Sequence, residues 1–451
     1  MAEIAPFTGI RYNQTVAGEL SKVVSPPYDV ISPEDRVYYH QLHPANFVRL
    51  VLGEEFETDD DAHNRFTRAR SYLNDWLARG ILKSDPEPSI YVYQQIFERG
   101  GREHKVRGFT CAVRLHDYAD RVILPHENTL AKPKSQLIQL MRATRANLDS
   151  IYALYADESG VVDAILDRVT AGEPAAQAIG KNGVRHVQWV LSDPAEVAKI
   201  VEFLKPGQIA IADGHHRYET SLAYRDERAT STHCHSERSE ESAFPARDSS
   251  QACPERSRRA RNDTQSADCT LMTLVNVYQK DMTIFPTHRV VDGLDAVVLE
   301  RLDHDLGELF EVARSSAGTL LADMARLGAI GMYRKGEAVT LKPRPESRPL
   351  MNGSEASRDL ELNVLHKLIL ERVLGIDEDK LRNQTHVYYT REPEEAMRLV
   401  DSGKSQVAFL LNNIAVKSVL DVASAGERMP QKATYFYPKL ISGLVLRRLA
   451  G

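Results

Sequence analysis

The sequence has no apolar run that could span a membrane, and it has few cysteines. No apolar stretch in its 451 residues approaches the roughly 20 residues that a transmembrane helix needs. The N-terminal stretch MAEIAPFTGI lacks a basic region followed by an apolar core, so we expect no secretion signal. The four cysteines include Cys234, Cys253 and Cys269, which lie in or beside one polar segment and form neither a disulfide framework nor a paired zinc motif. These absences predict a cytoplasmic protein without a membrane partner.

An excess of positive charge is also missing. Asp and Glu total 63 against 57 Lys and Arg, which gives a formal net charge of −6. Proteins that bind nucleic acid mainly through its phosphates carry a basic surface. We therefore do not expect nucleic acid as a partner, although a local basic patch is compatible with this charge. The sequence does not indicate an oligomeric state.

Residues 229–267 differ in composition from the rest of the chain. They are rich in Ser, Arg and Glu and nearly free of apolar residues, so they cannot bury enough surface to offset the entropy of ordering. His233, Cys234 and His235 resemble metal ligands, but zinc sites are held by folded scaffolds. We interpret the segment as a disordered surface insertion, because lengthening a loop adds little closure entropy.

Strand and helix patterns alternate through the remaining sequence. The runs Ile90–Phe97 and Val106–Leu115 are separated by turn residues and predict a β-hairpin. The run Asn46–Leu52 reads as another strand, with Arg49 among apolar neighbours. Hairpins combined with strand–helix alternation predict the α/β (α+β) class with mixed sheets.

The same patterns suggest a division of the chain into two parts. We expect an N-terminal phosphate- or nucleotide-binding region over residues 1–290 and a C-terminal α/β region over residues 291–451. The stretch 427–440 is dense in polar and aromatic residues and has no helical or strand period. A segment that folds back over a cleft would explain this composition, and a packed tail whose tyrosines cover a sheet is the alternative.

The densest group of chemically active side chains is the run Asp213–Arg217, DGHHR. It follows an apolar strand-like run and precedes a helical pattern. A helix N-terminus after a glycine offers free backbone N–H groups to an anion, and Arg217 adds a guanidinium that can bind phosphate through two hydrogen bonds. His215 and His216 can donate to phosphate oxygens, and Asp213 can bind a metal ion or accept a proton. The structural alternative is that Asp213 and the histidines only cap and order a turn.

DGHHR, followed by Tyr-Glu and a helix of small residues, resembles the phosphate-binding motif of the ParB-like superfamily. That superfamily includes chromosome-partitioning CTP-binding proteins, sulfiredoxin and free-serine kinases that use ADP or ATP. The whole chain is similar to the bacterial and archaeal domain-of-unknown-function family 1015. The motifs that carry this similarity are RYNQTVAGELSKVVSPPYDVIS, NFVRLVLG, LPHENTL, RATRANLDSIYALY, ADGHHRYETSLAYRDER, PTHRVV and GERMPQKATYFYPKLISGL.

The resemblance implies a ParB-like N-terminal nucleotide-binding part plus a C-terminal α/β part, with ATP or ADP and Mg²⁺ as cofactors. It also implies that nucleotide phosphates are bound by Gly214, His215, His216 and Arg217. In sulfiredoxin-like relatives a reactive cysteine stands at the place of His215, so its absence here argues against sulfinic-acid reduction.

The catalytic candidates follow from similarity to the kinase relatives. Asp213 is the main candidate and also the expected metal ligand, and His216 is a further one. Glu127 is the first candidate for the general base, and Asp29, on a loop stiffened by two prolines, is the second. The alternative for Glu127 is a surface carboxylate paired with Arg142 or Arg145. Candidate substrate-binding residues are polar or aromatic side chains outside the turn: Asp29, Arg49, His126, Arg142, Arg145, His288, Arg289, Gln431, Lys432, Tyr435 and Lys439.

These features predict a nucleotide-dependent phosphotransferase, similar to a kinase, that acts on a small hydroxy-acid or amino acid such as serine or phosphoserine. A nucleotide-binding regulator of the ParB-like superfamily is one alternative, and a phosphatase-type hydrolase is another. A regulator that acts on DNA is expected to have a helix-turn-helix domain and a basic face, and the sequence indicates neither. The identity of the nucleotide and the direction of the reaction do not follow from the sequence.

Overall fold

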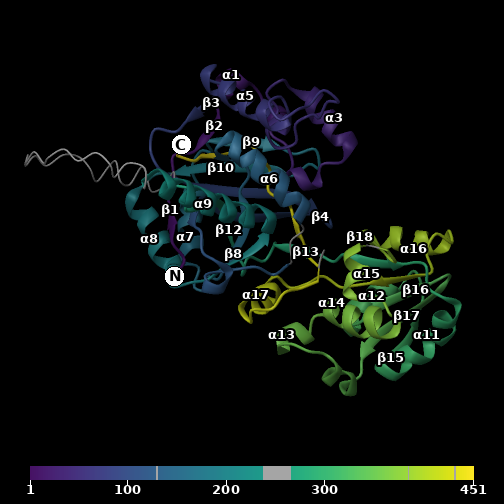
Figure 1. Ribbon diagram of the computed structural model, residues 1–451. Coiled ribbons are helices and arrows are strands. Elements are labelled where there is room, and N and C mark those ends of the chain that lie inside the picture. The colour runs from purple at the N-terminus through teal and green to yellow at the C-terminus, as the bar shows by residue number, and fades with distance from the viewer. Residues whose placement is uncertain (128–130, 237–265, 384, 431–432, 451) are drawn as a thin grey trace, which may run out of the picture. The chain divides into compact units, whose positions relative to one another are not determined.

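The computed structural model describes residues 1–127, 131–236, 266–383, 385–430 and 433–450 (Figure 1). The chain divides into two compact units. Unit 1 comprises Met1–Leu124, Thr129–Asp281 and Pro438–Gly451, and unit 2 comprises Pro125–Asn128 and Met282–Tyr437. Helices and sheets occur in both units, so the predicted α/β class with mixed sheets is confirmed. The predicted boundary after residue 290 and the return of residues 427–440 to a cleft stay predictions.

Unit 1 is built on a mixed sheet that has nine strands over the described residues. Eight of them follow the order β6-β11-β8-β12-β5-β4-β10-β9, and β1 pairs with β5. The strands are β1 (Ile4–Ala5), β4 (Ile90–Arg99), β5 (Arg102–Arg114), β6 (Ile123–Leu124), β8 (Ile151–Tyr155), β9 (Ala176–Ile179), β10 (Arg185–Leu191), β11 (Ile209–Asp213) and β12 (Cys269–Asn276). The pairs β11–β6 and β12–β8 are parallel, and the other pairs of this sheet are antiparallel. The predicted hairpin is the pair β4–β5.

Both faces of this sheet are buried. In β4, Ile90 and Val92 belong to the larger core, whereas Tyr91 packs on the opposite face with residues from the two ends of the chain. Helices α7 (Val161–Thr170) and α8 (Pro194–Leu204) bury apolar side chains in the larger core. Smaller elements of unit 1 are β2 (Ile10–Tyr12), β3 (Leu82–Ser84), β7 (Ala146–Asn147), β21 (Arg447–Arg448), α1 (Gln14–Ala17), α2 (Leu20–Val23) and α3 (Pro33–Leu42).

Helix α9 (His215–Ser236) starts directly after β11 and packs against α6 (Ala131–Thr144), which packs in turn against α5 (Arg65–Ala78). Figure 1 shows α6 and α9 beside the sheet. Tyr218 in the first turn of α9 is fully buried, and its hydroxyl donates to the carbonyl oxygen of His116. This contact fixes the start of α9 on the sheet. The predicted insertion at 229–267 begins inside α9, and its residues 237–265 lie outside the described residues.

The prediction of a strand at Asn46–Leu52 is wrong. The structure has a short helix there, α4 (Val48–Val51). The side chain of the fully buried Asn46 accepts a hydrogen bond from the backbone N–H of Val48, and its amide donates to the carbonyl oxygens of Lys22 and Val24. An Asn side chain that accepts from the backbone two residues on favours a turn over an extended segment, so the local apolar pattern did not decide the conformation.

Unit 2 contains a six-stranded sheet in the described residues, with the order β15-β17-β16-β19-β14-β18 and only antiparallel pairs. Its strands are β14 (His288–Val291), β15 (Phe310–Ser315), β16 (Ile330–Arg334), β17 (Glu337–Pro343), β18 (Val387–Thr390) and β19 (Val407–Leu410). The helices are α11 (Ala296–Leu309), α12 (Leu320–Leu327), α13 (Glu355–Arg358), α14 (Glu361–Val364), a π-helix (Leu365–Val373), α15 (Glu378–Asn383), α16 (Pro393–Asp401) and α17 (Val416–Ser424). A separate two-stranded pair joins β13 (Thr283–Phe285) to β20 (Tyr435–Tyr437).

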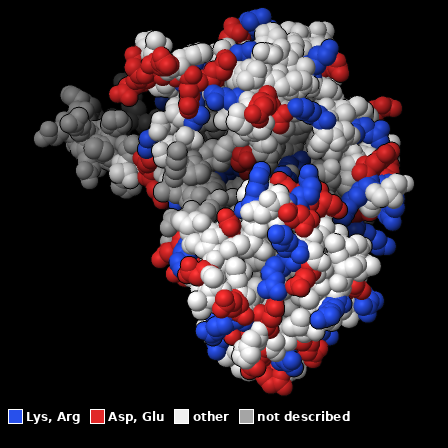
Figure 2. All heavy atoms as spheres, turned by 90° about the vertical axis from the view of Figure 1, so that its right-hand side faces the viewer, with Lys and Arg blue, Asp and Glu red and all other residues white. Residues whose placement is uncertain are grey.

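Charges of both signs are interspersed on the face of the molecule that Figure 2 shows. The exposed ion pairs of the described chain include Lys417 with Asp421 at 3.0 Å. Such pairs contribute about 0–1 kcal/mol each, so the stability of each unit comes mainly from its buried core. Among the described helices, none has the length and apolar character that crossing a membrane requires.

Candidate functional site

Gly214 joins β11 to α9 in a conformation that favours glycine. Its φ is 101°, and a Cβ atom at this position would lie 2.8 Å from Nε of Arg217. Residues with a Cβ rarely adopt such a φ. The glycine therefore permits both the sharp turn and the close approach of the Arg217 guanidinium to the backbone.

Asp213, the last residue of β11, lies between two cationic groups. The guanidinium of Arg217 donates to one carboxylate oxygen at 2.9 Å, and the ammonium of Lys439 donates to the other at 2.6 Å. The side chains of Arg217 and Lys439 are each 11% exposed, and that of Asp213 is 19% exposed. Arg217 also donates to the carbonyl oxygen of Ser150. Two largely buried cations, Arg217 of the turn and Lys439 of the C-terminal segment, thus converge on Asp213.

The charges of this cluster shift the pKa values of its carboxyl groups in opposite directions. Burial alone would raise the pKa of Asp213, but Lys439 and Arg217 outweigh it and lower this pKa to about 2. The pKa of Asp29 is raised, by burial first and then by the negative charge of Asp213. Burial lowers the pKa of Arg217, but the nearby carboxylates outweigh burial and raise it. Carboxyl groups whose pKa values are pushed apart are typical of sites that move protons.

Asp29 lies on the loop that the two prolines stiffen, as predicted. Pro27 is extended, with φ −58° and ψ 148°, and Asp29 follows in a short 3₁₀ turn, Tyr28–Val30. The loop is anchored by a pair of backbone hydrogen bonds between Ser25 and Ser442, in the same C-terminal segment as Lys439. As a residue Asp29 is exposed to solvent, but the protein atoms around its carboxyl desolvate it and raise its pKa. The loop therefore holds this carboxyl at the surface side of the buried Asp213–Arg217 pair.

Asp149 is a member of this cluster that sequence reasoning missed. Burial raises the pKa of its carboxyl, while Arg217 and a hydrogen bond from Ser442 oppose the rise. One of its oxygens is buried and has no hydrogen-bond partner among the described residues. The available signal was its position two residues before the buried strand β8, which neighbours β11 in the sheet. An acid in front of a strand is common at turns, so sequence alone did not single it out.

The two histidines of the turn differ in burial. The His215 residue is only 5% exposed, whereas His216 is half-buried. Burial lowers the pKa of the His216 imidazole, and Lys134 and Arg217 contribute to this lowering while Glu219 opposes it. His216 is therefore mainly neutral at pH 7, in a form that can either donate or accept a hydrogen bond.

A small cavity of about 50 Å³ adjoins the guanidinium of Arg217 and is lined in part by Tyr28, Asp149 and Thr220. Its volume suits one or two water molecules. A nucleotide is too large for this cavity.

The other arginines predicted for unit 1 have different environments. Arg49 in α4 donates to the carbonyl oxygen of His40 at 2.7 Å. Arg142 in α6 pairs with Glu227 of α9 at 2.6 Å, and both side chains are about half exposed. Arg145 is exposed and has a left-handed backbone conformation, with φ 49°. Their contact with a substrate stays a prediction.

The remaining predicted residues belong to unit 2. Glu127 accepts a hydrogen bond from Thr434 at 3.3 Å, and the ring of His126 contacts the same threonine at 3.0 Å. His288 and Arg289 lie in the buried strand β14. Burial lowers the pKa of His288 to about 4 and that of Arg289 to about 10.

Three predicted residues of unit 2 remain: Tyr435, Gln431 and Lys432. The Tyr435 ring in β20 lies 4.0 Å from the guanidinium carbon of Arg391. Gln431 and Lys432 lie outside the described residues.

Asp213 already has two cationic partners, since one carboxylate oxygen accepts from Arg217 and the other from Lys439. A Mg²⁺ ion bound there would lie beside both positive charges, and the expected role of Asp213 as a metal ligand stays a prediction. In the described part of the chain, no group of three or more His, Cys, Asp or Glu side chains could hold a metal ion. We therefore derive no chemical step from a metal bound by Asp213.

The fold and this cluster define an α/β protein of two units with a charged strand–glycine–helix turn. The chain belongs to the family described as "Protein of unknown function (DUF1015)", whose model matches residues 4–368. Among curated proteins, a sequence search finds no match.

Solved structures with a similar fold include three from different sources. A free serine kinase in complex with AMP is 13% identical with a TM-score of 0.33, and the alignment covers 73% of this chain and 86% of the kinase. A conserved hypothetical protein from Pyrococcus furiosus is 11% identical with a TM-score of 0.33, over 74% of this chain and 92% of that protein. SbnI with a C-terminal truncation, from Staphylococcus aureus, is 11% identical with a TM-score of 0.34, over 74% and 85%. Similarity at this level does not establish a shared ligand or activity.

Proposed function

We propose that the protein is a nucleotide-dependent phosphotransferase whose phosphate site is the Asp213–Arg217 turn. The observation that carries the proposal is the convergence of a glycine-initiated helix N-terminus with the two cations that hold Asp213. N–H groups of the first helical turn and the positive end of the helix dipole favour an anion. Gly214, His215, His216 and Arg217 would surround the phosphates, as the similarity of DGHHR to the ParB-like motif implies.

The proposed reaction transfers a phosphoryl group from ATP or ADP to the hydroxyl of a small hydroxy-acid or amino acid such as serine. The substrate oxygen forms a bond to phosphorus, the bond from phosphorus to the nucleotide oxygen breaks, and a general base takes the hydroxyl proton. Asp29 is the base candidate in unit 1, because the residue lies on an exposed turn and its pKa is raised, first by desolvation of the carboxyl and then by the charge of Asp213. Glu127 in unit 2 is the other candidate. Mg²⁺ would enter with the nucleotide phosphates.

A kinetic comparison of two aspartates tests this role. The full-length protein is incubated with Mg²⁺ and either ATP or ADP, with serine as acceptor, and phosphoserine is measured by mass spectrometry. We expect Asp29→Asn to lower kcat by about 100-fold or more, which is typical for loss of a general base, with nucleotide affinity unchanged. Asp35→Asn is the matched control, because Asp35 only pairs with Lys181 on the surface of the same unit. Unchanged turnover in Asp29→Asn would show that Asp29 is not the general base, and Glu127 would then be the remaining candidate.

Two other outcomes would favour the alternatives. Stabilisation by CTP alone, without turnover of any acceptor, would indicate a nucleotide-binding regulator. Release of inorganic phosphate without an acceptor would indicate a hydrolase. Absence of binding to ATP, ADP and CTP would overturn the proposal.

A further inference from the structure

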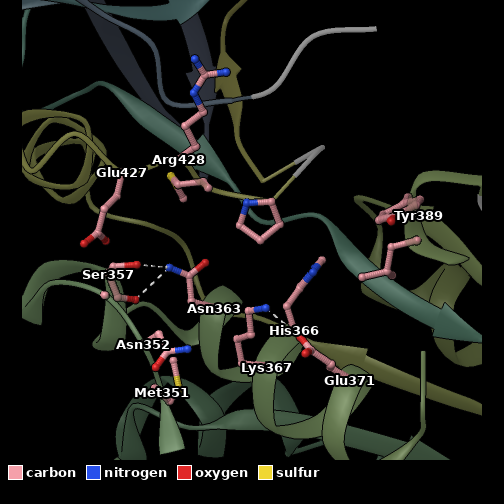
Figure 3. A pocket seen from close by; sticks show the side chains of 14 residues that line it. Met351, Asn352, Ser357, Asn363, His366, Lys367, Glu371, Tyr389, Glu427 and Arg428 are labelled. Atoms are coloured by element: carbon pink, nitrogen blue, oxygen red, sulfur yellow. Dashed lines mark hydrogen bonds and ion pairs between the residues drawn. The ribbon is translucent and has the colours of Figure 1, made fainter. Parts of the chain in front are cut away.

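Unit 2 contains a pocket that the proposed phosphotransfer does not use. Its volume is about 390 Å³, within the range of roughly 300–1,000 Å³ that small-molecule sites occupy. Its wall includes Asn352, Asn363, His366, Lys367, Tyr389 and Met429 (Figure 3). All of its lining residues belong to unit 2.

One wall of the pocket is formed by α14 and the π-helix that continues it. Asn363, Lys367 and Glu371 recur every four residues along this segment and all line the pocket. A π-helix is rarer than an α-helix and is frequently found at functional sites, where its wider turn changes the direction of side chains. Here the four-residue spacing places three polar side chains on the same wall.

Asn363 presents a fixed hydrogen-bond acceptor. Its amide nitrogen donates to both the carbonyl oxygen and the hydroxyl of Ser357, at 2.8 and 2.9 Å. Because a carbonyl oxygen can only accept, these contacts determine which end of the amide is nitrogen. In Figure 3 the Asn363 oxygen points away from Ser357 and toward the pocket. A ligand there must therefore offer a donor to this oxygen.

His366 adds a polar group that the described protein leaves unsatisfied. The residue is only 7% exposed, and its Nε2 has no hydrogen-bond partner among the described residues. Burial, followed by the charges of Arg289 and Lys367, keeps the pKa of this imidazole well below its usual range. The ring is therefore neutral and does not attract an anion.

Three charged side chains of the wall, Lys367, Glu371 and Glu427, have partners within unit 2. Lys367 pairs with Glu371 at 2.7 Å, and Glu427 accepts hydrogen bonds from the backbone N–H and the hydroxyl of Ser354. Arg428 is exposed, and in Figure 3 its guanidinium extends away from the other labelled side chains. The rest of the wall includes Met351, Met429, Pro430 and Leu381, which are apolar. This balance favours an uncharged ligand over a phosphate or a carboxylate.

We propose that this pocket binds an uncharged heterocycle that carries a ring N–H, such as a cyclic amide or a free nucleobase. The ring N–H donates to Oδ1 of Asn363, and the flat apolar body of the ligand packs against the methionines, whose flexible side chains adapt to its shape. This pocket and the Asp213–Arg217 turn share no residue, because the pocket is lined by unit 2 and the turn belongs to unit 1.

The test compares heterocycles with and without a ring N–H. Uracil, adenine and 1,3-dimethyluracil, which lacks a ring N–H, are titrated into the full-length protein by calorimetry and saturation-transfer NMR. We expect uracil or adenine to bind, and 1,3-dimethyluracil to bind at least ten-fold more weakly than uracil. Binding of neither uracil nor adenine, or equal binding of uracil and its methylated form, would overturn the proposal.

Three variants locate the binding. Asn352→Trp starts from an exposed position and fills the pocket, so it should abolish binding without changing the fold. Asn363→Leu removes the acceptor and should weaken binding at least ten-fold, and circular dichroism checks that this buried substitution still folds. Arg217→Ala should leave heterocycle binding unchanged, which separates this site from the proposed nucleotide site. Binding that persists in Asn352→Trp, or that is lost in Arg217→Ala, would contradict the assignment.

Discussion

At the scale of single residues, the turn depends on how Asp213 is held. Its carboxylate has one cation on each oxygen, and the three side chains are largely buried. Removing one partner of a buried ion pair leaves uncompensated charge, which is far more costly than losing an exposed pair. Asp213 therefore contributes to stability as well as to the proposed phosphate site.

We expect Asp213→Asn to lower the free energy of unfolding by about 3 kcal/mol, measured by urea denaturation at pH 7. Asp75→Asn is the matched control, because the Asp75–Arg79 pair in α5 is exposed, and it should cost less than about 1 kcal/mol. If the two substitutions lower the free energy of unfolding equally, the buried cations do not need Asp213 as a neutralising partner.

The same substitution should change the pH dependence of stability. The folded-state pKa of Asp213 is about 2, below the ordinary value of 3.8. Such a carboxylate stabilises the fold fully above pH 3.8, and this contribution is lost as the pH falls toward 2. The stability difference between the native protein and Asp213→Asn should therefore be constant from pH 7 to pH 5 and shrink between pH 4 and pH 2. A difference that does not change with pH would contradict the assigned pKa.

At the scale of elements, the junction of β11 and α9 depends on Gly214. In Gly214→Ala the new Cβ would combine an unfavourable φ with a contact to the Arg217 guanidinium. We expect a loss of stability of about 1–3 kcal/mol together with weaker nucleotide binding. Gly80→Ala is the control, since Gly80 also has a positive φ, 69°, but its Cβ would meet no atom within 4 Å. If both variants bind nucleotide as the native protein does, nucleotide binding does not require the close approach of the Arg217 guanidinium to the backbone of Gly214.

Elements with a strong local pattern could be predicted from the sequence. The β4–β5 hairpin and the helices α7 and α8 follow from apolar spacing and turn residues. The segment at Asn46–Leu52 could not be predicted in this way, because the hydrogen bonds of the Asn46 side chain to distant backbone decide its conformation. Local spacing carries no information about such contacts.

The site was only partly predictable for the same reason. DGHHR was recognisable because five chemically informative residues are adjacent in sequence. Lys439 was a candidate from its polar surroundings, but its pairing with Asp213 joins residues 226 positions apart. Asp149 entered the cluster only when β8 was found beside β11.

At the scale of the whole molecule, unit 1 is discontinuous in sequence. Its C-terminal segment, Pro438–Gly451, supplies Lys439 to the turn and Val445 to the second core, and it pairs with the N-terminal part through backbone bonds between Ile10 and Leu446. Unit 1 therefore completes its fold only with the last part of the chain.

A chain that ends at Tyr437 should lose protection from hydrogen exchange in β4 and β11. It lacks Val445, which packs with Tyr91 on the face of the sheet opposite the larger core, and it lacks Lys439, which pairs with Asp213. Adding a peptide of residues 438–450 in trans should restore this protection. Unchanged exchange in the shortened chain would show that the segment is not required for the fold of unit 1.

The most direct measurement of the central claim is calorimetric titration of ATP and ADP, each with Mg²⁺, into the full-length protein and two arginine variants. We expect the native protein and Arg225→Ala to bind at least one of the nucleotides with similar affinity, because Arg225 in α9 pairs with Asp117 and Asp226 away from the turn. Arg217→Ala should show no binding. Nucleotide binding that is unchanged in Arg217→Ala, or absent from the native protein, would contradict the assignment of Asp213–Arg217 as the phosphate site.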